Sequence, residues 1–325
     1  MRPRLLALVV CLLLPALSSA TEYQFRTVDV PFATTRNTSV TGLNDQGVSV
    51  GTYVQAGGTT NGFRLQRPRS RFEVLPQLAP QVITNTEVIA GHNGSVSPRQ
   101  GFVLIDGTFL EVRPGEPSGD RFGPFPAVLT EALDANDAGL VVGDFLSSVT
   151  QEFKGFVFDP RTFQSLVITI PGITGVRLSA INNLDELAAV GFDAANRTVS
   201  LLGDRVSQVF APFTVPDLDD PVVEIAGLTD TGAVAVNVGS VGVVVQDGVA
   251  QVIEVPGAVV TDLQGIRPDL TVYGAYIDET GAVHGFIATP EGTRLTPRMH
   301  SAGLHRPFTA TDCYPGCKRL VCRGD

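Results

Sequence analysis

The chain has 325 residues, of which 43% are hydrophobic and 17% charged, with 34 glycines, 22 prolines and a net charge of −10. This composition excludes a disordered chain, and the abundant Gly and Pro favour many short strands joined by turns. The acidic balance and the lack of a basic stripe within the repeats argue against a nucleic-acid partner, because phosphate binding needs clustered Lys and Arg.

The first 20 residues are predicted to be a signal peptide. Arg2 and Arg4 precede an apolar run, Leu5–Leu14, and small residues stand at the expected cleavage position after Ala20. The apolar run is shorter than the roughly 20 residues that span a bilayer. No second apolar span follows, so we expect a secreted product, extracellular or periplasmic, without a membrane span after cleavage.

A strand–turn–strand unit, Gly42–Tyr53 (GLNDQGVSVGTY), organises the mature chain. Asn44–Gly47 has turn chemistry, because Asn and Asp side chains bond nearby backbone and Gly tolerates positive φ. The residues after this turn are β-branched and aromatic, as is typical of a strand. Since a lone hairpin is marginal in water, the unit must pack against other strands.

Weaker copies of this unit recur along the chain, at spacings of 40, 52, 46, 47 and 38 residues. Each copy is predicted to hold four strands: one before the turn, one after it, a Gly-Phe strand and a strand that ends near Pro. A period of about 45 residues is that of four-stranded propeller blades. We therefore expect an all-β, six-bladed β-propeller over residues 21–297, with an open solenoid or paired sandwiches as alternatives. The turns of the six copies lie at Asn44, Thr84, Asn136, Asn182, Thr229 and Arg267.

Two features of the repeats carry further expectations. The Gly before Phe, as in Gly62-Phe63 and Gly155-Phe156, indicates close approach of neighbouring backbones. The strand Tyr23–Pro31 precedes the first copy and is spare, so it is predicted to pair into the last blade and latch the ring. Thr293–Pro297 is predicted to be the closing strand of the sixth copy.

The repeat pattern G-[IL]-N-D-x-G-x-x-V-G-x-[YF], then a Gly-Phe strand, then x-[IV]-x-[VI]-P-G, resembles the extracellular HAF-repeat proteins of bacteria. The resemblance implies export and a repeat architecture over most of residues 23–297, and it brings no activity and no catalytic residues. Some relatives end in a sorting tail that has no counterpart here. The residues that carry the resemblance are Gly42–Tyr53, Asn61–Phe63, Ala135–Phe145, Lys154–Phe156, Ile170–Gly172, Val255–Gly257 and His284–Phe286.

No catalytic, cofactor-binding or metal-binding residue is assigned from the sequence, and no cofactor is expected. His284 stands where other copies have Asn, Gln or Lys, and is expected to be a polar residue at a strand start. Asp217–Asp220 and the Asn-Asp turns are oxygen-rich, but they lack the spacing of an EF-hand, and turn formation explains them. The four histidines, none in a zinc-site spacing, are His92, His284, His300 and His305.

The C-terminal segment, residues 298–325, departs from the repeat and is predicted to be disordered. It holds three cysteines, Cys313, Cys317 and Cys322, which in an exported chain allow one disulfide and one free thiol, or a metal site that lacks a fourth ligand. The final Arg-Gly-Asp tripeptide is read as a chance match.

Two functions remain open. One is a non-enzymatic, surface-associated binding protein that presents a propeller face to a glycan or protein ligand. The other is an extracellular hydrolase or lyase that acts on a polysaccharide in the central channel. Because the turn residue changes between Asn, Thr and Arg, the turns are expected to be structural and function to lie in the loops between copies. The local acidic groupings that could mark a channel site are Asp219, Asp220, Asp278 and Glu279.

Overall fold

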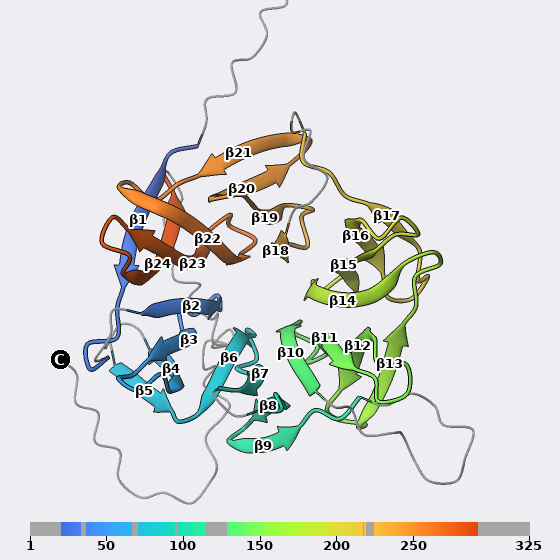
Figure 1. Cartoon of the computed structure of the whole chain (residues 1–325). Coiled ribbons are helices and arrows are strands. Elements are labelled where there is room, and N and C mark those ends of the chain that lie inside the picture. Colours follow the sequence, from blue (N-terminus) through green and yellow to red (C-terminus); the bar gives the residue numbers. More distant parts are fainter. Residues whose placement is uncertain are drawn as a thin grey trace, which may run out of the picture. The chain divides into compact units, whose positions relative to one another are not determined.

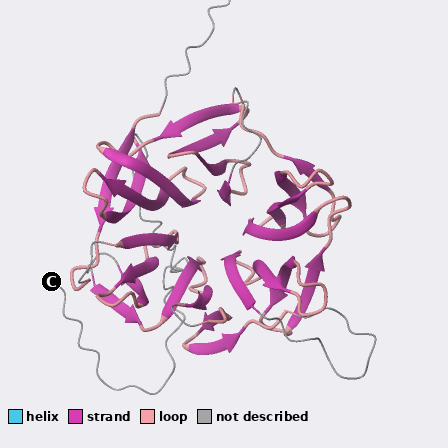
Figure 2. Ribbon diagram, viewed as in Figure 1, coloured by secondary structure: helices cyan, strands magenta, loops and turns pink. Residues whose placement is uncertain are grey.

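The computed structural model describes residues 21–33, 37–66, 71–94, 97–114, 129–216, 218 and 224–291. Within these ranges the chain forms six four-stranded antiparallel sheets, arranged as blades around a common centre (Figure 1). All regular elements there are strands (Figure 2), and no helix is long and apolar enough to cross a membrane. The expected all-β, six-bladed propeller is confirmed. The expected signal peptide and the cysteine tail lie outside the described residues.

Each of the first five blades takes its four strands in chain order from the centre outward. The first three blades are β2 (Thr38–Leu43), β3 (Ser49–Val54), β4 (Thr60–Gln66) and β5 (Arg71–Leu75); β6 (Leu78–Ile83), β7 (Ile89–Asn93), β8 (Gly101–Ile105) and β9 (Thr108–Glu111); β10 (Leu129–Ala135), β11 (Val141–Leu146), β12 (Phe153–Asp159) and β13 (Gln164–Ile168). The others are β14 (Thr174–Ile181), β15 (Glu186–Phe192), β16 (Thr198–Asp204) and β17 (Phe210–Pro212); β18 (Glu224–Leu228), β19 (Val234–Val238), β20 (Val241–Gln246) and β21 (Val249–Ile253); β22 (Ala258–Ile266), β23 (Val272–Asp278) and β24 (Val283–Pro290), with β1 (Tyr23–Val28).

The N-terminal strand closes the ring, as expected. β1 pairs antiparallel with β24, from Tyr23 opposite Pro290 to Val28 opposite Gly285, and is the outermost strand of the sixth sheet. It occupies the place that the sequence suggested for Thr293–Pro297, a segment outside the described residues. The fourth blade also differs in detail, because its outer strand lies before the predicted closing pair Val215-Pro216.

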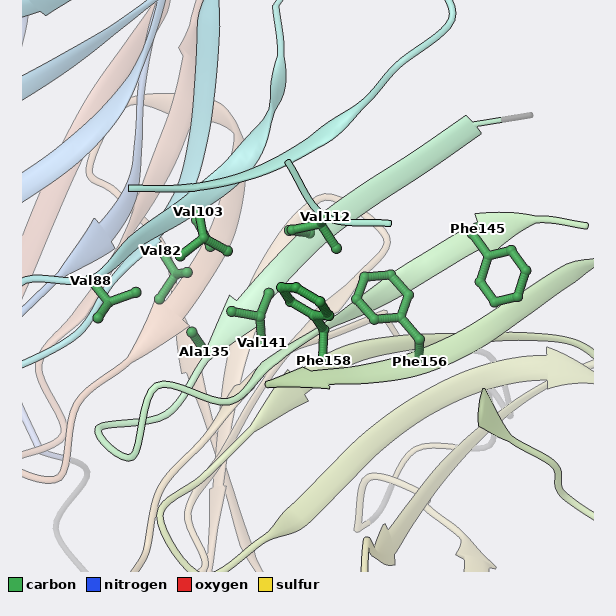
Figure 3. Close-up of a cluster of buried hydrophobic side chains, with 11 residues drawn as sticks. Val82, Val88, Val103, Val112, Ala135, Val141, Phe145, Phe156 and Phe158 are labelled. Carbon is green, nitrogen blue, oxygen red and sulfur yellow. The ribbon is translucent and has the colours of Figure 1, made fainter. Parts of the chain in front are cut away.

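The hydrophobic core lies between the blades. Among the described residues, six clusters of buried apolar side chains each join two neighbouring sheets, and Figure 3 shows the one between the second and third blades. In β11 the consecutive residues Val141 and Val142 are both fully buried, one facing the second blade and the other the fourth. The alternation of side chains along a strand thus buries both faces of a blade, which explains the apolar runs of the repeat.

Every innermost strand carries a β-bulge three residues before its turn, as at Leu133 between Ala132 and Asp134. The bulge pushes a carbonyl against the next strand. A Cβ at Gly143 would lie 1.9 Å from the Glu131 carbonyl oxygen, so only glycine fits there. Gly51, Gly91 and Gly274, at the same position of other blades, meet their own bulged strands at 2.0 to 2.2 Å.

The glycine of the Gly-Phe strand has a different neighbour, the innermost strand of the next blade. A Cβ at Gly155 would lie 2.8 Å from Leu178 Cγ, and one at Gly242 would lie 2.4 Å from Leu263 Cγ. The space is tight, as expected from the sequence, but at these two glycines a leucine side chain of the next blade fills it, not a neighbouring backbone. The following Phe156 is fully buried between the blades.

Removal of residues 21–28 should expose the edge of β24 and take Val28 out of the buried cluster between the sixth and first blades. We expect the melting temperature to fall by at least ~5 °C and the unfolding transition to broaden, because the last blade loses its outer strand. Differential scanning calorimetry measures both. Gln24→Ala, an exposed change on the same strand, is the control, and an unaltered melt of the truncated chain would count against the latch.

Gly143→Ala should lower the free energy of unfolding by about 2 kcal/mol or more, because the new methyl group overlaps the Glu131 carbonyl. The fourth blade has Ala189 at the same position, and Ala189→Gly should cost no more than about 1 kcal/mol. Urea unfolding followed by circular dichroism compares the two. Equal effects of both substitutions would contradict the steric explanation.

Candidate functional site

The first residue of each turn ties its own blade to the next. Asn44 Oδ1 accepts hydrogen bonds from the backbone N–H groups of Gln46 (3.1 Å) and Val48 (2.9 Å), which closes the turn. Asn44 Nδ2 donates to the Thr84 carbonyl of the second blade at 3.3 Å. Asn136 and Asn182 repeat this bond toward the following blade, each at 3.2 Å. The Asn turn is therefore both a cap and an inter-blade link.

Thr can replace Asn at this position because its hydroxyl keeps the cap. Thr84 Oγ1 accepts from Val88 N–H at 3.1 Å, and Thr229 Oγ1 accepts from Ala233 N–H at 3.0 Å. Thr has no amide group to donate to the next blade. The exchange preserves the turn and gives up one link, which agrees with the structural role expected from the sequence.

The second turn residues form a chain of hydrogen bonds around the mouth of the channel. In four of the blades, a side-chain oxygen of the second turn residue accepts a hydrogen bond from the backbone N–H of the second turn residue of the preceding blade. These four bonds are 2.7 to 2.8 Å long. Pro268, in the sixth blade, has neither an N–H nor a side-chain acceptor. Arg267 Nη2 instead donates to Asp45 Oδ1 at 3.1 Å and joins the sixth blade to the first. The five linked residues are Asp45, Asn85, Asp137, Asn183 and Asp230.

Beneath this ring lies a central cavity of about 270 Å³. Its walls are the turns together with the bulged residue of every innermost strand, so the bulges aim one side chain per blade into the cavity. The sequence analysis placed function in the loops between copies, whereas the turns themselves line this cavity. The six bulged residues are Thr41, Gln81, Leu133, Ser179, Ala226 and Gln264.

Two polar groups in the cavity wall satisfy backbone N–H groups of the next blade. Asp134 Oδ2 accepts from Ile181 N–H at 2.9 Å, and burial raises the pKa of Asp134 to about 7. The hydroxyl of Tyr273 accepts from Leu43 N–H, and it fills the space beside Gly265, where a Cβ would lie 2.2 Å from that oxygen. Both side chains thus have a structural role and also face the cavity.

The cavity is acidic. Five carboxyl groups line it, and Arg267 is the single basic residue among the described residues of its wall. Arg267 is engaged with Asp45 at 3.1 Å, so it compensates one carboxylate of the mouth. A group that enters from the mouth therefore meets a negative field. The five acids are Asp45, Asp134, Asp137, Glu224 and Asp230.

A second group of charges lies at the other end of the innermost strand, away from the turns. Glu131 stands directly opposite Asp144 in the register of β10 and β11, and both are buried. Arg177 from the fourth blade bonds Glu131 at 3.0 Å and lies 3.2 Å from Asp144. Arg99 from the second blade forms an ion pair with Glu131. Burial raises the pKa of Asp144 to about 6, although Arg177 opposes this.

Each of the two histidines within the described residues contacts groups of its own or an adjoining strand. His92 Nδ1 lies 2.7 Å from its neighbour's carbonyl, Asn93 O, and burial lowers the pKa of His92. His284 lies between Asp29 (2.9 Å) and Asp278 (3.3 Å) and thereby ties β1 to the sixth blade. Burial lowers the pKa of His284, but these hydrogen bonds outweigh that effect and raise it. His284 is a polar residue near a strand start, as expected.

Of the acidic groupings named from the sequence, the described pair Asp278 and Glu279 lies away from the cavity. Asp278 accepts bonds from the backbone of Thr280 (2.8 Å) and Ala282 (2.9 Å) and closes the β23–β24 turn, and neither it nor Glu279 lines the cavity. Asp219 and Asp220 lie outside the described residues. Among the residues that the structure does describe, no group of three or more His, Cys, Asp or Glu is placed to hold a metal ion.

The sequence analysis missed the cavity acids and the Glu131 group. A position-by-position alignment of the copies contains the signal. Asp134 stands two residues before its turn, where the other copies have Gly, Ala or Val, and Glu131 stands five residues before it. At this second position other copies also carry charges, Arg177 and Asp262 among them. Asp134 is an exception to a small or apolar pattern, whereas the position of Glu131 is charged in four of the six copies.

Comparison with protein-family models finds no match, and comparison with curated proteins finds none either. Among solved structures, the chain is similar to the β-propeller domain of the Trilobed protease from Pyrococcus furiosus, with 10% identity, a TM-score of 0.49, and coverage of 80% of this chain and 98% of that one. An AofleA mutant from Arthrobotrys oligospora is 10% identical, with a TM-score of 0.49 and coverage of 82% of this chain and 86% of that one. Trypanosoma rangeli sialidase in complex with the inhibitor DANA is 8% identical, with a TM-score of 0.48 and coverage of 84% of this chain and 60% of that one. These likenesses are too remote to transfer a ligand or an activity.

Stability should fall as the pH rises from 4 to 7. The folded-state pKa of Asp134 is raised above its unfolded value, so the folded chain binds the extra proton in this window and loses that advantage above it. Asp134→Asn should flatten the decline by on the order of 2 kcal/mol. Some slope should remain, because the pKa of Asp144 is raised in the same direction. Chemical unfolding at pH 5 and pH 8 measures the difference.

The matched control is Asp247→Asn, in the exposed turn between β20 and β21, which should leave the pH dependence unchanged. A slope for Asp134→Asn equal to that of the unmodified chain would show that Asp134 is ionised in the folded state throughout this range.

Proposed function

We propose that the protein is a secreted, non-catalytic binding protein of the HAF-repeat type, which holds an extracellular glycan or protein ligand at its turn face. The observation that supports this function is the central cavity of about 270 Å³, whose polar wall is preformed by inter-blade hydrogen bonds. A rigid pocket of fixed polar groups binds with little loss of conformational entropy. Secretion rests on the signal-peptide pattern of Met1–Ala20.

The carboxylates of this cavity favour binding over acid–base catalysis. A catalytic acid or base must reach a proton of the substrate and exchange it. Asp45, Asp137 and Asp230 instead accept hydrogen bonds from the neighbouring turns, and Asp134 accepts from Ile181 N–H. The oxygens of the three turn carboxylates already hold the blades together and provide a fixed negative potential, and the carboxyl group of Asp134 is held in place by the Ile181 N–H.

A hydrolase or lyase is the second candidate, and the Glu131–Asp144 pair is what favours it. Two carboxyl groups face each other across a pair of strands, and the raised pKa of Asp144 would keep an acid protonated near pH 6. Neither residue lines the central cavity, and both are clamped by Arg177. Turnover of an extracellular polysaccharide that is lost in both Glu131→Gln and Asp144→Asn would establish this alternative.

Ala226→Phe should block the cavity, because Ala226 is a bulged residue of its wall. An array of neutral, acidic and amino-sugar glycans, together with basic, neutral and acidic peptides, identifies a ligand by saturable binding. We expect Ala226→Phe to weaken that binding at least ~10-fold, equivalent to about 1.4 kcal/mol. The matched control is Ala195→Phe, in the exposed β15–β16 turn at the opposite end of the strands. Absence of saturable binding, or equal affinities for the two variants, would refute the proposed function.

A further inference from the structure

A groove lies beside the central cavity on the turn face, between the fourth and fifth blades. It has a volume of about 540 Å³ and is bordered by the first turn of the fourth blade, the β16–β17 turn and the first turn of the fifth blade. Leu228 and Thr229 line both the groove and the central cavity, so the two hollows adjoin at these residues. A ligand seated over the mouth of the cavity can therefore also enter the groove.

Two large apolar side chains of this groove are exposed. Leu184 is 59% exposed and Val209 is 70% exposed, and both line the groove, with Leu202 and Val234 among its other lining residues. Exposed apolar residues are common singly, but neighbouring ones that border a concave surface mark binding sites. The groove therefore offers a place for an apolar side chain of a ligand.

The fold does not require these side chains. At the turn position of Leu184 the other five blades have small or polar residues, and their turns form equally well. Two positions later, Glu186 stands where four other blades have Val, Leu or Ala, and it too lines the groove. The fourth blade thus departs from the repeat in residues that border the groove. The residues equivalent to Leu184 are Gln46, Thr86, Ala138, Thr231 and Asp269.

The charge of the face selects among ligands. The groove adds the carboxylates of Glu186 and Asp204 to the five acids of the cavity. The nearest basic residue of this turn, Arg205, is bound to Asp185 at 2.6 Å and also attracts Asp204, so it offsets only part of this charge. The chain as a whole carries a net charge of −10, so a second copy of the same face would be repelled. A partner of opposite charge is favoured.

We propose that this face docks a segment of a partner protein in which a large apolar side chain lies next to Lys or Arg. The apolar side chain packs on Leu184 and Val209, and the cationic group lies over the acidic mouth of the cavity. This inference rests on the proposed binding function and specifies its ligand as a basic, partly apolar protein segment rather than a glycan. No aromatic residue is among the described residues that line the groove, so it lacks a stacking platform for sugar rings.

Synthetic peptides test the pairing of the two contacts. The probe is a soluble eight-residue peptide with two leucines followed by two lysines, measured by fluorescence anisotropy. Matched peptides carry serine in place of leucine, or acetyl-lysine in place of lysine, which keeps the length and removes the charge. We expect the parent peptide to bind at least ~10-fold more tightly than either relative, and its affinity to fall with increasing salt.

Two variants of the protein locate the contacts. Leu184→Gln introduces the residue that the first blade has at this position and should weaken binding of the parent peptide at least ~10-fold. Asp230→Asn, at the mouth of the cavity, should weaken that binding several-fold and reduce its salt dependence, because it removes one carboxylate. Val252→Ser, an exposed apolar residue on the outer strand β21, is the control and should change neither. A thermal melt confirms that each variant is folded.

The outcomes separate this inference from the function on which it rests. Glycan binding that Ala226→Phe abolishes, without peptide binding, would leave the binding function standing and overturn the protein-segment ligand. Peptide binding that Leu184→Gln leaves unchanged would overturn the groove as the docking site. Spermidine that binds as tightly as the peptide would show that the cavity takes free cations, which also overturns docking. No binding by any probe would refute both proposals.

Discussion

The β-bulge three residues before each turn is the constraint on which the rest of the structure depends. It turns one side chain per blade into the channel, and in four blades it drives a carbonyl against the second strand so closely that Gly143 and the matching glycines have no room for a Cβ. It also positions the turn so that Asn44 Nδ2 donates a hydrogen bond of 3.3 Å to the Thr84 carbonyl of the next blade. Cavity wall, glycine pattern and inter-blade links are therefore consequences of one irregularity, repeated six times.

The acidity of the channel follows from this same geometry. Packing innermost strands side by side leaves backbone N–H groups facing the neighbouring blade, and a buried donor without a partner is costly. Asp134 satisfies one such group at Ile181, and the turn carboxylates satisfy those of the adjoining turns. The turn carboxylates of Asp45, Asp137 and Asp230 lie at the mouth, so the side chains that hold the ring together also create a negative field there. Structure and ligand preference are here two effects of the same side chains.

The sequence predicted what depends on periodicity. Repeated Asn-Asp-x-Gly turns, the Gly-Phe strands and the spare strand at Tyr23 were sufficient for six four-stranded blades and a latch. It could not predict which side chains of different blades come into contact. Glu131 and Arg177 are 46 residues apart in the sequence and meet only because two blades stack. The sequence predicted that Tyr23–Pro31 would pair into the last blade, but it could not show that β1 takes the outer place that it gave to Thr293–Pro297. That choice depends on ring closure, to which no local pattern refers.

The fourth blade shows how function and repeat can be separated on physical grounds. Where other copies have Gly-Phe it has Ser200-Leu201, both buried, so the interface still packs with a smaller side chain. Leu184 and Val209 contribute no comparable burial, and five other turns form with polar or small residues at the position of Leu184. A leucine that is 59% exposed gains little of the roughly 2 kcal/mol that full burial would provide. The proposed partner would bury this side chain from outside the chain, and the acidic mouth beside it favours a partner that is also cationic.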